Sequence, residues 1–282
     1  MRPELYIIEC KSNLHVGSGD SNYGVIDKLV QRDTTDTLPC IFSSSLKGAF
    51  REYFEEVVEH DKDKGKKELS DRIFGAGSNK NSPGPSKKGT HIFQQAFLLS
   101  IPLRSNQKPF YNAISPFMVE QLLEMAKLFG YTFPEALKKD LEIVKSLDPK
   151  DNKPFVFHET LNLEIEDFSV FDSRSEKLPE LQGIIGKDIV IVSNDDMKRL
   201  TNDYHLPVIA RNKLENGESK NLWYEQVIPR ESIFTAFVAT DVLPNDDLFN
   251  TNVNNKIVQI GGDSSVGYGY SLIYSLPKTK TL

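Results

Sequence analysis

The chain has 282 residues, of which 39% are hydrophobic and 26% charged, so it can bury a sizeable core and global disorder is excluded. No run approaches the roughly 18 apolar residues of a membrane-spanning helix, and the N-terminus lacks a secretory signal pattern. Cys10 and Cys40 are the only cysteines, which excludes a disulfide framework and a cysteine-based zinc site. We therefore expect a cytoplasmic protein.

The net charge is −6, which taken as a whole argues against a protein that coats nucleic acid. The charge is unevenly distributed, however. Residues 159–203 hold 11 acidic and 5 basic residues, and the remainder of the chain is balanced. A groove lined by positive charge is therefore still possible outside this acidic segment.

Strand-like and helix-like patterns alternate from the N-terminus. Residues 4–11 predict a strand, and a glycine-bearing loop then leads to a second short strand over 25–31. A serine among 43–45 can cap the helix that follows. The apolar residues expected on one face of this helix are Leu46, Phe50, Phe54, Val57 and Val58. Residues 60–90 are polar and rich in lysine and serine, and predict a mobile loop from which Ile73 and Phe74 fold onto the body.

The second half of the chain contains more strands and a long hairpin. Two helices are expected within 116–147, broken at GYTFP, with Met118, Leu122, Met125 and Leu128 on one face. The segments with strand character are 91–103, 155–171, the first part of 187–196 and 257–260. Residues 206–240 predict a long hairpin with the turn dipeptide Asn216-Gly217 at its tip. This alternation favours an α+β fold on an antiparallel sheet, and a split βαβ, ferredoxin-like core with insertions fits it.

Common catalytic and cofactor motifs are absent from the sequence. The first glycine loop lacks the following helix of a dinucleotide site, and SSSLKG lacks the upstream glycine of a P-loop. The two glycine loops, 17–24 and 261–269, fit either a phosphate cradle or tight turns. Lys47 and Arg51 lie one helical turn apart and fit either a ligand or a solvated face, and Asp27 fits either a turn residue or a catalyst.

Four sequence motifs that occur in a fixed order resemble those of a known protein family. They are LHVGSG (14–19), GVIDKLVQRD (24–33), SSSLKGAFR (43–51) and GGDSSVGYGY (261–270). Together they resemble the RAMP superfamily of CRISPR-associated proteins, and more narrowly the repeated backbone subunit of type III effector complexes. GVIDKLVQRD together with LWYEQVIP (222–229) is similar to the type III-B (Cmr) version.

This resemblance implies a single RAMP domain over 1–282 with an RRM-like palm. It also implies a mobile or helical insertion at about 52–150 and a β-hairpin thumb at about 206–230. Copies stack head to tail on a CRISPR RNA together with the other subunits of the complex. The thumb pushes between guide and complementary target RNA, which is cleaved at regular intervals. The resemblance implies no membrane partner.

The resemblance also assigns site residues. Asp27 is the implied catalytic residue and metal ligand, with Mg²⁺ or Mn²⁺, in an endoribonuclease whose products end in a 2′,3′-cyclic phosphate. His15 is a further candidate, to relay a proton or hold RNA, and Glu225 a candidate to assist the metal. The implied RNA-binding residues are Ser45, Lys47, Arg51, Gly261, Gly262, Gly267, Gly269, Asn216 and Gly217. Tyr268 stands where a basic residue is frequent, which leaves stacking as a substitute for one backbone contact.

Two rival functions remain open on the sequence. One is a RAMP subunit that only binds the guide. The other is a guide-processing RAMP endoribonuclease with a histidine-centred, metal-independent site. A structural protein that binds no nucleic acid is a more distant third.

Overall fold

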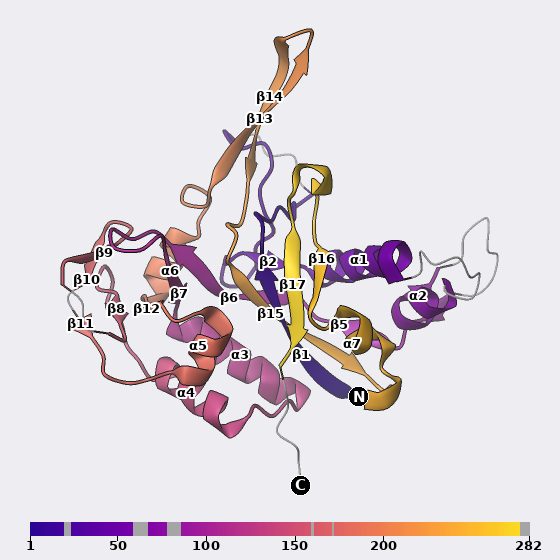
Figure 1. Ribbon diagram of the computed structural model, residues 1–282, viewed down its shortest axis with the longest axis horizontal. Coiled ribbons are helices and arrows are strands. Elements are labelled where there is room, and N and C mark those ends of the chain that lie inside the picture. Colours follow the sequence, from indigo (N-terminus) through magenta and orange to yellow (C-terminus); the bar gives the residue numbers. More distant parts are fainter. Residues whose placement is uncertain (20–23, 59–66, 78–85, 159–160, 171, 277–282) are drawn as a thin grey trace.

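The computed structural model describes residues 1–19, 24–58, 67–77, 86–158, 161–170 and 172–276 (Figure 1). The strands are β1 Arg2–Cys10, β2 Cys40–Ile41, β3 Gly75–Ala76, β4 Lys87–Lys88, β5 His91–Phe93, β6 Ala96–Leu103, β7 Tyr111–Ile114, β8 Phe155–Val156, β9 Leu163–Ile165, β10 Phe168–Val170, β11 Asp172–Ser173, β12 Ile189–Ile191, β13 Val208–Glu215, β14 Glu218–Gln226, β15 Ile233–Thr240, β16 Lys256–Gln259 and β17 Tyr270–Ser275. The helices are α1 Ser43–Tyr53, α2 Lys67–Phe74, α3 Pro116–Phe129, α4 Glu135–Lys145, α5 Pro179–Ile185, α6 Asn194–Leu200 and α7 Leu248–Val253. A π turn extends α1 over Phe54–Val58, and 3₁₀ turns cover Pro244–Asp246 and Ser264–Val266.

One large sheet organises the molecule, in the order β11-β8-β12-β7-β6-β15-β1-β17-β16, with β2 on β6 and β5 on β15. Within this sheet β11 pairs with β8 and β12 with β7 in parallel, and the other pairings are antiparallel. The mixed α and β architecture with a mostly antiparallel sheet confirms the predicted fold class. None of the helices described is long and apolar enough to cross a membrane.

Both faces of the central strands are covered, which explains why β15 is buried along its whole length. On one face Phe237 of β15 lies 5.4 Å, between ring centroids, from Phe129 of α3. On the other face Tyr6 of β1 packs edge-on against Phe249 of α7 at 5.6 Å. Successive side chains of a strand point to opposite faces, so β1 and β15 each supply both layers of the core.

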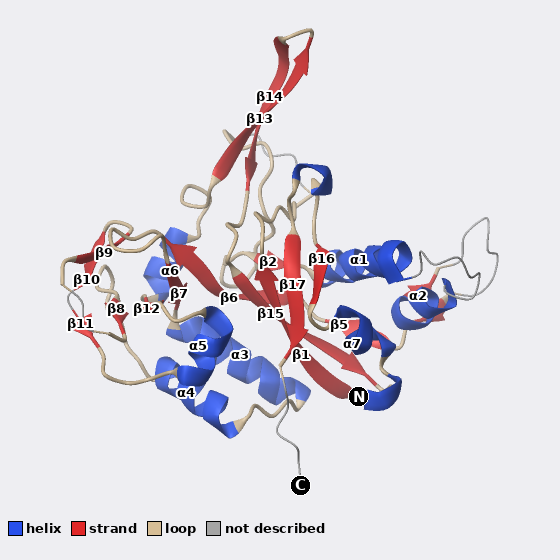
Figure 2. Cartoon of the chain, viewed as in Figure 1, coloured by secondary structure: helices blue, strands red, loops and turns tan. Residues whose placement is uncertain are grey.

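The hairpin β13–β14 leaves this body and projects from it alone (Figure 2). Asn216 and Gly217 at its tip both have positive φ, 53° and 84°. That geometry is the two-residue turn that matches the twist of the flanking strands, and it confirms the predicted tip. The hairpin ends at Gln226, because the rest of the predicted 206–240 unit forms β15 in the large sheet.

Some local predictions are wrong. Residues 25–31 form no strand: Val30 and Lys28 pair as isolated bridges with Gly17 and Glu225, so the segment is shared between two neighbours. The helix α1 begins after Phe42, and no side chain accepts a capping hydrogen bond there.

Two further outcomes concern the apolar faces and the lysine-rich stretch. Leu128 of α3 is 73% exposed, because it lies on the solvent side of the helix. Of the predicted mobile loop 60–90, residues 60–66 and 78–85 lie outside the described residues. The described part includes the helix α2, and Ile73 and Phe74 are buried as predicted. Within 52–150, β5, β6 and β7 belong to the large sheet.

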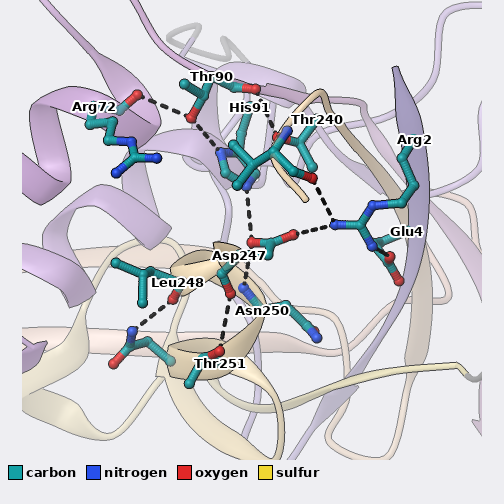
Figure 3. A network of polar contacts seen from close by, with 12 residues as sticks. Arg2, Glu4, Arg72, Thr90, His91, Thr240, Asp247, Leu248, Asn250 and Thr251 are labelled. Carbon is teal, nitrogen blue, oxygen red and sulfur yellow. Dashed lines mark hydrogen bonds and ion pairs between the residues drawn. The ribbon is translucent and has the colours of Figure 1, made fainter. Parts of the chain in front are cut away.

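A buried polar network joins distant parts of the chain at the far end of the sheet from the hairpin (Figure 3). Asp247, just before α7, accepts from Arg2 Nη2 of β1 at 2.9 Å and lies 3.2 Å from Nε2 of His91 in β5. The Asp247 side chain also accepts the Asn250 N–H at 3.1 Å and so caps α7. Burial raises the pKa of Asp247, but the hydrogen bonds from His91 and Asn250 outweigh it and leave the pKa lowered.

Candidate active site

Four segments meet at the base of the hairpin, two near the N-terminus and two from the last third of the chain. Leu14 and Ile228 exchange backbone hydrogen bonds of 2.9 and 2.8 Å. These bonds join the first glycine motif, residues 14–19, to the segment that follows the hairpin. The Gly262 N–H donates to the His15 carbonyl at 2.9 Å and adds the second glycine loop. The bridge between Lys28 and Glu225 adds the 24–33 segment. The structure therefore brings His15, Asp27, Glu225 and the 261–269 loop into one region.

Asp27 is held beside the outgoing strand of the hairpin. Its backbone N–H donates to the Tyr224 carbonyl at 3.0 Å, and its Oδ2 accepts the Tyr224 N–H at 2.7 Å. This reciprocal pair fixes the orientation of the carboxylate. Oδ1 has no hydrogen-bond or ion-pair partner within the described parts of the chain, and the residue is exposed. Asp27 therefore presents one oriented oxygen to solvent.

Glu225 lies one residue further along β14 and is fully buried. Its Oε1 accepts from Lys28 Nζ at 2.6 Å and Trp223 Nε1 at 2.7 Å, and its Oε2 accepts from Arg211 Nη1 at 2.8 Å. Burial on its own raises the pKa of Glu225, but the three donors outweigh it and lower the pKa to about 2. Glu225 is therefore an ionised carboxylate whose oxygens are both already engaged.

Arg211 of β13 was not singled out by the sequence, yet it connects the hairpin to the second glycine loop. Besides Glu225, its Nη1 lies 2.6 Å from Oδ1 of Asp263. Its guanidinium lies over the rings of Trp223 and Tyr268, at 5.5 and 5.9 Å from the centroids. Hydrogen bonds to the two carboxylates raise the pKa of Arg211. Tyr268 thus stacks on a cation of its own chain.

His15 is buried beneath this region, with 5% of its surface exposed. Its Nδ1 lies 2.7 Å from the carbonyl of Gln226 and donates to it, since a carbonyl can only accept. A Cβ on Gly17 would come within 3.3 Å of its Nε2. The ring is therefore enclosed, with Nδ1 committed to the hairpin backbone.

The second glycine loop needs glycine at two positions for close approach. Gly261 and Gly269 have φ of 86° and 80°, and a Cβ there would meet the carbonyls of His15 at 2.3 Å and Ile260 at 2.0 Å. Gly262 and Gly267 have open space where a Cβ would stand. Gly261 therefore lets the loop approach His15 closely, Gly269 lets the loop close on Ile260, and Gly262 and Gly267 stand at exposed positions.

The helix residues predicted to bind RNA lie beside this region. Ser45 and Arg51 make hydrogen bonds within the fold, whereas Lys47 lines a groove. Gln31 Nε2 donates to Ser45 Oγ at 2.9 Å and to the Gly17 carbonyl at 3.1 Å, linking the start of α1 to the first glycine motif. Lys47 lines an open groove further along the helix. Arg51 donates to the Gly75 carbonyl and lies 5.8 Å from the centroid of the Phe74 ring, so it is engaged within the fold.

The hairpin tip is remote from the base. The strands β13 and β14 rise about 3.4 Å per residue, so the eight residues of β13 carry Asn216 and Gly217 roughly 25 Å away. The tip is therefore separate from Asp27. Any contact it makes with a ligand extends outward from the body (Figure 1).

A metal ion at this site can draw on one free carboxylate oxygen. Within the described residues no group of three or more His, Cys, Asp or Glu side chains is arranged to hold a metal. Glu225 is surrounded by two cations and an indole N–H, which leaves Oδ1 of Asp27. Mg²⁺ is commonly held by one or two carboxylates, waters and substrate phosphates, so Asp27 fits a metal that binds together with a phosphate ligand.

Comparisons with known proteins agree with one another. The RAMP superfamily model matches residues 7–272. The CRISPR system Cmr endoribonuclease Cmr4 of Pyrococcus furiosus is 27% identical over 277 residues, covering 91% of this chain and 90% of that protein. A solved type III-B Cmr-beta complex bound to cognate target RNA contains a chain that superposes with a TM-score of 0.75 at 20% identity, covering 98% of both chains. Oligomeric Cmr4 from Pyrococcus furiosus superposes with a TM-score of 0.69 at 19% identity, covering 99% of this chain and 100% of the other. The solved structures share the fold.

Proposed function

The chain belongs to the RAMP superfamily, and from this we propose that it is the guide-binding, target-cleaving backbone subunit of a type III-B CRISPR effector complex. In this proposal copies of the chain stack head to tail on a CRISPR RNA, beside the other subunits of the complex. They cleave the complementary RNA at regular intervals. Support comes from the Cmr4 relative, which is described as an endoribonuclease, and from the similar chain solved with cognate target RNA.

The observation that carries the proposal is the orientation of Asp27. Its carboxylate is fixed by Tyr224 at the base of a hairpin that projects from the body, and its Oδ1 has no partner among the described residues. A strand of target RNA displaced by the hairpin would run past this oxygen. Both the sequence motif that contains Asp27 and this geometry support the choice of Asp27 as the catalytic residue.

The reaction proposed is attack by a ribose 2′-hydroxyl on the adjacent phosphate. The new P–O2′ bond forms as the P–O5′ bond breaks, leaving a 2′,3′-cyclic phosphate and a 5′-hydroxyl. The 2′-hydroxyl loses its proton, and the leaving oxygen gains one. In-line attack requires a splayed nucleotide, because a stacked A-form strand misaligns the three reacting atoms. The hairpin is the element that would separate the strands.

We assign the remaining candidates supporting roles. Glu225 holds Lys28, Arg211 and Trp223 together and so stiffens the base of the hairpin. His15 anchors the hairpin backbone through Gln226. The exposed backbone at Gly262 and Gly267, with Ser45 and Lys47, faces the guide, and Asn216-Gly217 faces the duplex at the hairpin tip.

A divalent cation, Mg²⁺ or Mn²⁺, is part of the proposal. Asp27 would hold it, and it would stabilise the negative charge that develops on the phosphate. Chelation by EDTA is expected to abolish cutting by the assembled complex, and added Mg²⁺ or Mn²⁺ to restore it. Cutting that persists in EDTA would contradict the metal requirement without affecting guide binding.

The decisive experiment assembles the complex on a defined guide and maps cuts in a complementary RNA. Wild type is expected to give regularly spaced cuts. Asp27→Asn keeps the size of the side chain and is expected to reduce cutting at least 100-fold, on the order of the effect of losing one electrostatic or acid–base group. The control is Asp151→Asn, an exposed aspartate in the turn before β8, and it should cut as wild type does.

Each rival predicts a different result. Normal cutting by the Asp27→Asn complex would favour a subunit that only binds the guide. Cutting of precursor RNA by the isolated chain, unaffected by EDTA, would favour a guide-processing enzyme. Wild type that binds no RNA at all would contradict every form of the proposal.

A further inference from the structure

An open groove lies between α1 and the paired strands β3 and β4. Its volume is about 490 Å³. One wall is a stripe on α1, and the opposite wall is formed by Phe74–Gly77 and Lys87–Gly89. The α1 residues that line it are Ser44, Lys47, Gly48 and Arg51. Their spacing of i, i+3, i+4 and i+7 puts them on one helix face, opposite the core residues Leu46, Ala49 and Phe50.

Among the described residues, the charged side chains that line this groove are all positive. Its lining includes Lys47, Arg51, Lys87 and Lys88 and no aspartate or glutamate. Lys87 and Lys88 are exposed, and within the described residues no carboxylate lies within ion-pair distance of Lys47, Lys87 or Lys88. Three lysines without a carboxylate partner repel one another and favour a polyanionic ligand.

The wall that carries Lys87 and Lys88 is built rigidly. A Cβ on Gly75 would meet the Lys87 carbonyl at 2.6 Å, and one on Gly89 would meet the Ile73 carbonyl at 2.3 Å. Only glycine allows the strands to close this tightly. Arg51 then ties α1 to β3 through the Gly75 carbonyl, so both walls are held at a fixed separation.

We propose that this groove binds the phosphate backbone of a single RNA strand, with Lys87 and Lys88 as phosphate contacts beyond those on α1. The inference rests on the proposed function and extends its guide-binding surface. Ser45, next to the groove residue Ser44 at the start of the same helix, is joined through Gln31 to the Gly17 carbonyl, so α1 links the groove to the region of the hairpin base. A strand that leaves the base along α1 therefore enters the groove, where small residues such as Gly48 and Gly77 let its backbone approach.

The rival polyanion is the acidic segment 159–203 of a second copy. In the same copy the hairpin β9–β10 of this segment lies on the opposite side of the molecule from α1 (Figure 1). A second copy would have to supply it. RNA is favoured because the groove is open at the surface and shares the helix α1, including Lys47, with the proposed guide-binding residues.

The test measures binding of the full-length chain to a fluorescent oligouridine over a range of NaCl concentrations. Lys87→Ala/Lys88→Ala should weaken binding and flatten the plot of log K against log salt by roughly 1.4, about 0.7 for each lost contact with a single strand. Lys87→Arg/Lys88→Arg should restore the wild-type slope. The matched control, Lys138→Ala/Lys139→Ala, removes an exposed lysine pair from α4 and should leave the slope unchanged.

The experiment distinguishes a failure of the groove proposal from a failure of the proposed function. Wild type that binds oligouridine, with the Lys87→Ala/Lys88→Ala slope unchanged, would overturn the groove and leave the proposed function intact. An unchanged slope together with a smaller oligomer in light scattering would assign the groove to a second copy. Wild type that binds no RNA would overturn both. Equal melting temperatures of the variants exclude a folding defect as the cause of weaker binding.

Discussion

At the scale of single residues, two carboxylates beside Tyr224 acquire opposite roles. Glu225 follows Tyr224 in the sequence, and Asp27 is hydrogen-bonded to the Tyr224 backbone. Glu225 is surrounded by Lys28, Arg211 and Trp223 and is fully buried, so its charge stabilises the fold. Asp27 has one oxygen fixed by Tyr224, and its other oxygen has no partner in the part of the chain that the structure describes, so its charge is available to a ligand. The difference lies in which donors the tertiary structure brings to each group.

The pH dependence of stability follows from the pKa of Glu225. The pKa falls from 4.5 to about 2 on folding, which corresponds to about 3 kcal/mol. A lowered pKa stabilises the fold above pH 4.5, and this contribution is lost as the pH falls from 4.5 toward 2. Glu225→Gln should therefore lower the free energy of unfolding in urea by about 3 kcal/mol at pH 7, and by roughly half of that or less at pH 3.

The control for this prediction is Glu164→Gln, an exposed glutamate of β9. It should unfold as wild type does at both pH values, since exposed substitutions typically change stability by less than about 0.5 kcal/mol. A difference between Glu225→Gln and wild type that stays constant down to pH 3 would contradict the assignment of a lowered pKa. It would point to a packing defect instead.

At the scale of elements, the turn of the hairpin was predicted correctly from the sequence, but the pairing register of its two strands was not. Asn216-Gly217 predicts the turn correctly. A two-residue turn alone would pair Arg211 with Leu222, but an irregularity between Lys213 and Leu214 shifts the register and sets Arg211 opposite Trp223. This shift puts Arg211, Trp223 and Glu225 on one face of the hairpin. No local pattern announces it, so the Arg211 cluster could not be predicted.

Other elements likewise differ in whether the sequence predicts them. The helices α3 and α4 were predicted because their apolar residues repeat with a helical period and GYTFP separates them. The strand expected over 25–31 failed because a strand needs a continuous partner, and this segment has single bridges to two. Local periodicity is thus readable from sequence, whereas pairing depends on the tertiary structure.

The hairpin tip gives an element-scale prediction. Gly217 has a φ of 84°, which costs a β-branched residue roughly 1–3 kcal/mol. Gly217→Val should speed hydrogen exchange of the β13–β14 amides while the exchange of β15 stays slow, because the hairpin lies outside the large sheet. Gly217→Asn, which tolerates this conformation, should keep the wild-type protection. Equal protection in the valine and asparagine variants would contradict the role of the turn.

At the scale of the whole molecule, the two ends of the sheet are specialised. The hairpin end carries the words from which the sequence predicted a site, and its exposed groups face outward. The opposite end carries the network of Arg2, His91 and Asp247, which joins the first strand to residues near the end of the chain (Figure 3). We infer that this second network closes the fold and takes no part in RNA chemistry, since it is buried and lies at the far end from Asp27.

Because the two ends are separate, Asp247→Asn and Asp27→Asn should have opposite effects on stability and on RNA cutting. Asp247→Asn keeps the cap on α7 but removes the charge that Arg2 and His91 contact, and should lower the free energy of unfolding by about 2 kcal/mol, the scale of hydrogen bonds to a charged group. Below its melting temperature the variant should still cut target RNA at wild-type positions. Asp27→Asn should do the reverse, with normal unfolding and lost cutting.

The matched control is Asp246→Asn, at the exposed neighbouring position, which should change neither property. A fall in stability with Asp246→Asn as large as with Asp247→Asn, or altered cut positions with Asp247→Asn, would show that the two ends are not independent.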